Sequence, residues 1–198
     1  MKRRFFVLLF LVLFLLSTQN VFSVKVTLSH VPASVDEFIK IRDSVATTPE
    51  GGAAIMVLAL MVYANDHELG KQCLTIAITR EYLDEGNVYK GFQPRKANMQ
   101  LIESQMQKHP YLPKAYIKGA TTENGYKIPD KNLVLEIFTT KYSGDKSTGM
   151  LKVFVEVYGY MARPVTLKVN DKGLWKAYEW SSLVVGVSPP KDNSKDDL

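Results

Sequence analysis

Cysteine and histidine are scarce in this chain, which has 198 residues but only one Cys and three His. A single cysteine can form no internal disulfide bond, so the class of disulfide-stapled scaffolds is excluded. Apolar residues surround Cys73 in the sequence, which predicts a buried, unreactive thiol. His30, His67 and His109 lie far apart, without a Cys or His at ligand spacing. We therefore expect no metal site and no cofactor.

The chain also lacks the glycine and serine motifs of common enzyme classes. It has no Gly-x-Ser-x-Gly sequence for an acyl-transfer nucleophile, and no phosphate-binding or dinucleotide-binding glycine pattern. Ser143 and Lys146 match Ser-x-x-Lys, but both lie in one glycine-containing loop, which we interpret as a solvated turn. The familiar serine-dependent and nucleotide-dependent chemistries are therefore not expected.

After its first few residues the chain carries little net charge. The formal net charge is +5, from 25 Lys and Arg against 20 Asp and Glu. Three of the basic residues are Lys2, Arg3 and Arg4, and without them the net charge is +2. The remaining charges are interspersed, so no basic stripe is available for phosphates. The sequence predicts no nucleic-acid partner.

The first 23 residues have the pattern of a signal peptide. The cationic start is followed by an apolar run over residues 5–16, and Val21 and Ser23 stand at the positions that a signal peptidase reads. We expect cleavage after Ser23 and export to a periplasmic or extracellular location. A retained membrane anchor is the alternative, but a spanning helix needs about 20 apolar residues. After cleavage we expect no stable membrane span.

Residues typical of helix N-termini predict two helices in the next part of the chain. Ser34 and Glu37 have the spacing of a capping box, which predicts a short first helix. Thr48 and Pro49 suit the start of a second helix. Residues 53–64 of that helix are apolar except for one tyrosine hydroxyl, so we expect it at the centre of the core.

Two further helices are predicted. Asp66 can cap a third helix over residues 67–80, and a more polar fourth helix covers residues 95–108 after a glycine-containing loop. Gly51 and Gly52, in the first turn of the second helix, could present backbone N–H groups to an anion. We interpret them instead as a point of close packing against a neighbouring element.

In the second half of the chain, apolar residues recur at every second position instead of at helical spacing. Residues 116–120 are a further candidate strand, and Gly173 provides the turn of a hairpin. The order predicts an α+β fold, with about four N-terminal helices packed on a C-terminal antiparallel sheet of about four to five strands. Residues 24–188 form one domain, and residues 189–198 are expected to be a disordered tail. The alternating segments are residues 133–138, 151–158, 165–169 and 174–180.

Two glutamates are the candidate catalytic residues. Glu136 and Glu156 lie on adjacent predicted strands, on the face opposite the aliphatic residues. A glycosidase needs only two carboxyl groups held a few ångströms apart, so these two could serve a hydrolase. A solvated sheet face also carries such residues routinely.

Aromatic residues crowd the C-terminal strands and are the candidate binding residues. If helices do not cover both sheet faces, these rings would form an exposed platform for a glycan, a peptide or a partner protein. The alternative is that they pack beneath the helices or pair across strands. The candidates are Phe154, Tyr158, Trp175, Tyr178 and Trp180.

Two segments carry a resemblance to a known family. Together they resemble a bacterial domain family of unknown function that is found in exported and cell-envelope proteins. The resemblance covers most of the chain after the signal peptide and implies no activity, cofactor or catalytic residue. The segments are Thr47-Thr48-Pro49-Glu50-Gly51-Gly52-Ala53-Ala54, leading to Cys73-Leu74, and Arg163-Pro164-Val165 through Gly173-Leu174-Trp175-Lys176 to Trp180-Ser181-Ser182-Leu183.

Three functions remain open from the sequence. The first is an exported, non-catalytic module that binds a ligand or partner protein through its sheet or a helix–sheet cleft. The second is a carboxylate-dependent hydrolase that uses Glu136 and Glu156. The third is a structural component of the cell envelope, which would present a flat apolar patch and oligomerise.

Overall fold

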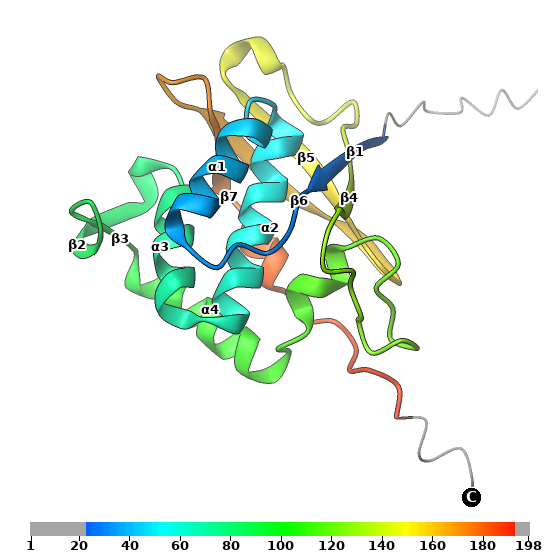
Figure 1. Ribbon diagram of the computed structural model, residues 1–198. Coiled ribbons are helices and arrows are strands. Elements are labelled where there is room, and N and C mark those ends of the chain that lie inside the picture. Colours follow the sequence, from blue (N-terminus) through cyan, green and yellow to red (C-terminus); the bar gives the residue numbers. More distant parts are fainter. Residues whose placement is uncertain (1–22, 193–198) are drawn as a thin grey trace, which may run out of the picture.

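The computed structural model describes residues 23–192 as an α+β domain, with helices on one face of an antiparallel sheet (Figure 1). Of the predicted signal peptide it describes only Ser23, and of the predicted tail only residues 189–192, so both remain predictions. Within the described range, no helix has the length and apolar character needed to cross a membrane.

Four α-helices precede most of the sheet, as predicted, and the first three begin at the predicted caps. Ser34 Oγ accepts a hydrogen bond from Glu37 N at 3.2 Å, Thr48 Oγ1 from Gly51 N at 3.0 Å, and Asp66 Oδ1 from Leu69 N at 3.0 Å. Each cap satisfies an N–H group that has no partner within its helix. The helices are α1 (Val35–Val45), α2 (Pro49–Asn65), α3 (His67–Ala77) and α4 (Lys96–Lys108).

Helix α3 ends three residues before the predicted boundary at Arg80. Ile78 forms a parallel bridge with Ala177, and Thr79 N donates to Ala177 O at 2.9 Å. The chain therefore leaves the helix to cover the edge of the last strand. This contact joins positions about 100 residues apart in the sequence, which local helical spacing cannot show.

The main sheet has five strands in the order β1-β4-β5-β6-β7, and all neighbours are antiparallel. The alternating segments predicted four of these strands. Strand β1 was not among the predicted strands, and it pairs with β4 from Ser23↔Phe138 to Leu28↔Leu133. The strands are β1 (Ser23–Leu28), β4 (Leu133–Phe138), β5 (Met150–Val157), β6 (Tyr160–Val169) and β7 (Trp175–Glu179).

Helix α2 is the centre of the core, as its apolar sequence predicted. All its residues from Gly51 to Tyr63 are buried, and it contacts all five strands of the main sheet. Many of the sheet residues that share this core have no exposed surface. Their burial fixes the register, because a slip by one residue would turn every one of them to solvent. They include Leu133, Leu135, Ile137, Val153, Val155, Val165 and Leu167.

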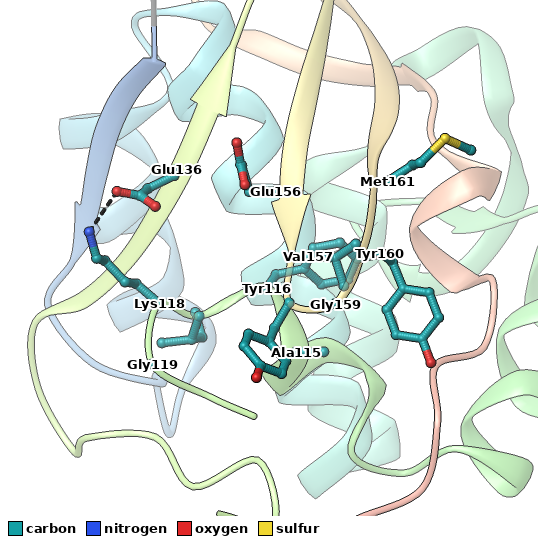
Figure 2. A pocket seen from close by; sticks show the side chains of 12 residues that line it. Ala115, Tyr116, Lys118, Gly119, Glu136, Glu156, Val157, Gly159, Tyr160 and Met161 are labelled. Carbon is teal, nitrogen blue, oxygen red and sulfur yellow. Dashed lines mark hydrogen bonds and ion pairs between the residues drawn. The ribbon is translucent and has the colours of Figure 1, made fainter. Parts of the chain in front are cut away.

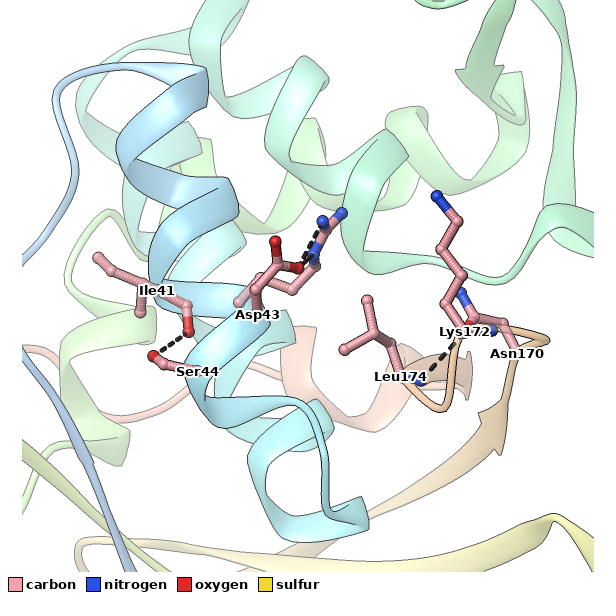
Figure 3. Close-up of polar contacts among 7 residues, drawn as sticks. Ile41, Asp43, Ser44, Asn170, Lys172 and Leu174 are labelled. Carbon is pink, nitrogen blue, oxygen red and sulfur yellow. Dashed lines mark hydrogen bonds and ion pairs between the residues drawn. The ribbon is translucent and has the colours of Figure 1, made fainter.

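The β6–β7 hairpin turns where the sequence predicted. Asn170 Oδ1 accepts hydrogen bonds from the backbone N–H groups of Lys172 and Leu174, both at 3.0 Å (Figure 3). Gly173 has φ +74°, a value that glycine adopts without strain. The turn lies opposite the C-terminal end of α1, where Arg42 and Asp43 form an ion pair at 2.6 Å (Figure 3).

Two local predictions were wrong. The loop after α3 contains a second sheet, formed by β2 (Leu83–Tyr89) and β3 (Phe92–Pro94). Its sequence is polar and short, so no apolar alternation marks it. Residues 116–120 are not a strand, because Leu112–Tyr116 form a 3₁₀ helix and the chain then turns. Tertiary contacts at both ends of this segment override its extended local preference.

The predicted burial of Cys73 is confirmed, since the free thiol has no exposed surface. Burial, with a smaller effect from the Asp66 charge, raises the pKa of the Cys73 thiol to about 12. We therefore expect no reaction of the native protein with Ellman's reagent at about pH 8, and release of one equivalent of chromophore once guanidinium chloride unfolds it. Rapid labelling of the native protein would contradict the buried position.

Candidate functional site

A split in the main sheet creates the first candidate site. Strands β4 and β5 pair only at Ile137↔Val155 and Phe138↔Phe154. Beyond these positions the residue 112–119 segment is bonded to both strands. Tyr158 N donates to Ala115 O at 3.2 Å, and Lys118 N donates to Val134 O at 2.8 Å. This end of the sheet is therefore held open by a segment that is not itself a strand.

A pocket of about 530 Å³ lies at this split, and we name it the split-sheet pocket (Figure 2). Its walls come from the inserted segment, from the ends of β4 and β5, and from the start of β6. Gly159, with φ +73°, makes the tight β5–β6 turn that brings the β6 wall close. The lining residues are Ala115, Tyr116, Ile117, Lys118, Gly119, Glu136, Glu156, Val157, Tyr158, Gly159, Tyr160 and Met161.

Both candidate glutamates line the split-sheet pocket. The Ile137↔Val155 pair places Glu136 and Glu156 opposite each other, one position further along their strands. Glu136 Oε1 accepts a hydrogen bond from Lys118 Nζ at 2.7 Å, and this ion pair lies at one side of the pocket (Figure 2). Glu156 is exposed, and within residues 23–192 it has neither an ion-pair nor a hydrogen-bond partner.

The five candidate aromatic residues do not form one platform. Tyr158 lines the pocket, is 47% exposed, and donates to Glu123 Oε2 at 3.4 Å. Phe154 stacks on Phe138 with ring centroids 5.5 Å apart. Tyr178 packs edge-on against Tyr82 at 4.9 Å.

The two tryptophans belong to the core. Trp175 is 6% exposed and Trp180 is 4% exposed, so neither offers a ring to a ligand. Burial alternates along β7, with Trp175 and Ala177 on the buried face and Tyr178 on the other. Trp180 follows the strand, so alternation along the strand could not show that it is buried. Burying two indoles also stabilises the domain more than leaving them in water.

The candidate residues chosen from the sequence did not include Lys118, Tyr160 or Met161. Tyr160 is 38% exposed, and its hydroxyl bonds to Ser188 in the C-terminal segment. Met161 is 88% exposed at the pocket wall. Lys118 lies in the segment that was predicted to be a strand. The run Tyr158-Gly159-Tyr160-Met161, which places two aromatic rings and a methionine at a glycine turn, is the sequence signal for this wall.

Metal-ligating side chains do not converge in the part of the chain that the structure describes. Within residues 23–192, no group of three or more His, Cys, Asp or Glu side chains could hold a metal ion. The polar groups that line the split-sheet pocket include the Glu136 and Glu156 carboxylates and the Lys118 ammonium group.

One protein family matches this chain. Residues 30–191 match the family described as Domain of unknown function (DUF6935). No curated protein and no solved structure matches the chain. The matched range contains all four α-helices, the split-sheet pocket and every strand except β1. The chain therefore belongs to the DUF6935 family of domains of unknown function.

Proposed function

We propose that this domain is a non-catalytic binding module that takes an uncharged oligosaccharide in the split-sheet pocket. The observation that carries the proposal is the combination of an unpaired carboxylate, Glu156, with exposed tyrosine rings in one pocket. We also propose that the domain acts after export, because the first 23 residues have the pattern of a signal peptide.

The polar groups of the pocket suit hydroxyl groups. A hydroxyl both donates and accepts hydrogen bonds. Glu156 offers only acceptors, whereas the Lys118–Glu136 pair places a donor beside an acceptor at 2.7 Å. Hydrogen bonds to ionised groups are stronger than those between neutral groups, so these residues can hold a neutral ligand by its hydroxyls.

The aromatic wall suits the apolar face of a sugar ring. Tyr158 and Tyr160 present partly exposed rings, and Met161 adds an exposed thioether beside them. Tyrosine combines an apolar ring with a polar tip, and buries area at little cost in side-chain entropy. An anionic ligand is disfavoured, because Glu156 would repel it and Lys118 is already paired.

The first test is Tyr158→Ala. We expect cellobiose or N,N′-diacetylchitobiose to shift the ¹³C-methyl resonance of Met161 saturably, and the variant to bind roughly threefold to tenfold more weakly, as loss of an aromatic contact predicts. Tyr142→Ala is the matched control, because Tyr142 is 75% exposed and lies outside the pocket. Equal binding by both variants, or failure of both disaccharides to move Met161, would count against the proposal.

Glucuronic acid provides a control on charge. The pocket should bind glucuronic acid more weakly than glucose. Glu156→Gln should reduce this difference in affinity, because it removes the repulsion between the Glu156 carboxylate and the carboxylate of the sugar. If glucuronic acid binds more tightly than glucose, the pocket recognises anions and the proposal is wrong.

A carboxylate-dependent hydrolase is the second candidate. The observation in its favour is that Glu136 and Glu156, from neighbouring strands, line the same pocket. Against it, Glu156 is exposed to solvent, whereas the general acid of a glycosidase lies in surroundings that favour its protonated form. Incubation with the same disaccharides distinguishes the two functions. Release of monosaccharide that Glu156→Gln abolishes would establish the hydrolase.

A further inference from the structure

A second pocket, of about 350 Å³, lies on the helical side of the domain, and we name it the helix-corner pocket. It forms where α2 turns into α3 and α4 packs against them. Asp66 ends α2 and caps α3, so only one residue separates the two helices. The sequence motifs did not point to this site, and the split-sheet pocket shares no residue with it.

The floor of the helix-corner pocket is apolar and partly aromatic. Tyr63 and Met106 are buried, and both line the pocket. The ring of His67 stacks on that of Tyr63, with centroids 4.7 Å apart and planes 19° apart. A pocket of this size, with a mainly apolar lining and a few polar groups, is typical of a site for a small molecule.

The rim carries a carboxylate that has no cationic partner. Glu103 is exposed on α4, and within residues 23–192 no lysine, arginine or histidine forms an ion pair with it. Burial, with a further contribution from the neighbouring Glu103 carboxylate, raises the pKa of Tyr63. Tyr63 therefore stays a neutral donor, and the carboxylate keeps acceptor sites for a ligand.

We propose that the helix-corner pocket binds a small primary amine whose apolar body lies over Met106 and the Tyr63–His67 stack and whose ammonium group pairs with Glu103. No lysine or arginine lines the pocket, so it offers no permanent positive charge to a ligand carboxylate. An ammonium group beside the Tyr63 ring also gains attraction from the ring face. This site is independent of the oligosaccharide site proposed above.

Three phenyl compounds that differ only in their polar end test this proposal. They are 2-phenylethylamine, 2-phenylethanol and 3-phenylpropionate, titrated separately into protein with ¹³C-methyl-labelled methionine. We expect the amine to shift the Met106 methyl resonance saturably, the alcohol to bind several-fold more weakly, and the acid not to bind. Met161 reports on the other pocket in the same spectrum and should not move.

Glu103→Gln is the decisive variant, because it keeps the shape of the side chain and removes its charge. It should weaken binding of the amine roughly fivefold, as expected for an exposed charge pair, and leave the alcohol unaffected. Glu156→Gln, in the split-sheet pocket, is the matched control and should change neither affinity. Equal binding of all three compounds, an unmoved Met106 methyl group, or an unchanged amine affinity in Glu103→Gln would overturn the proposal.

Discussion

Replacement of Gly52 by alanine is expected to lower the free energy of unfolding by about 2–3 kcal/mol or more. A Cβ atom at Gly52 would lie 2.6 Å from the backbone oxygen of Trp175 and 2.9 Å from its Cβ. Neither atom is at the end of a flexible side chain, so α2 and β7 would have to move apart and loosen the core. The close packing inferred for this glycine from the sequence is thereby confirmed.

The direction of the stability change distinguishes a tightly packed glycine from an exposed one. In an exposed helix, glycine to alanine usually stabilises a protein, by up to about 1 kcal/mol. Gly70→Ala should destabilise in the same way as Gly52→Ala, because its Cβ would lie 2.2 Å from the Cα of Tyr63 where α3 crosses α2. Urea denaturation followed by circular dichroism measures both changes.

Gly86→Ala is the control for these two variants. The three atoms nearest to its Cβ would belong to the side chain of Gln93, which can rotate away, and Gly86 is only partly buried in the small β2–β3 sheet. We expect a change of less than about 1 kcal/mol. If Gly52→Ala proves as stable as the unaltered protein, the approach of α2 to β7 is not as close as described.

The features that the sequence predicted correctly are local. The caps at Ser34, Thr48 and Asp66 depend on side chains within three residues of the helix start, and all three form. The uniform apolar character of residues 53–64 sufficed to place α2 in the core. Glu136 and Glu156 were brought to one pocket because each alternates with buried residues and their strands are adjacent.

Two of the features that the sequence did not predict depend on distant contacts. The pairing of β1 with β4 joins residues more than 100 positions apart. The segment that opens the split-sheet pocket is held by bonds to Val134 and Tyr158, and nothing in its own sequence requires them. Lys118 was therefore missed, although it is the partner of a predicted site residue. The conformation of this segment is determined by its contacts with the rest of the fold rather than by its own sequence.

Lys176→Met is expected to stabilise the domain near neutral pH. Lys176 is largely buried in β7, and no carboxylate pairs with it among the residues that the structure describes. Burial, with a further contribution from the Arg42 guanidinium, lowers the pKa of Lys176 from 10.5 to about 8. The guanidinium of Arg42 is itself paired with Asp43, at 2.6 Å. The folded state therefore carries an ammonium group that it solvates poorly.

The stability difference between Lys176→Met and the unaltered protein is expected to depend on pH. Below about pH 8 Lys176 is charged in both the folded and the unfolded state, so the folded protein carries the full free-energy cost of burying the ammonium group. In this range Lys176→Met should be more stable than the unaltered protein by up to about 3 kcal/mol. Between pH 8 and 10.5 the unfolded chain binds more protons than the folded one, so the unaltered protein gains stability as the pH rises. The difference between the two proteins should therefore shrink over this range and vanish above it.

Urea denaturation at a series of pH values measures this difference directly. Tyrosines whose pKa values are raised in the fold, such as Tyr116 and Tyr126, also change the stability at high pH, but they do so equally in both proteins. Lys172→Met, at an exposed position in the adjacent turn, is the matched control and should change stability by less than about 0.5 kcal/mol. A stability difference for Lys176→Met that stays constant with pH would show that the gain comes from apolar packing rather than from removal of a buried charge.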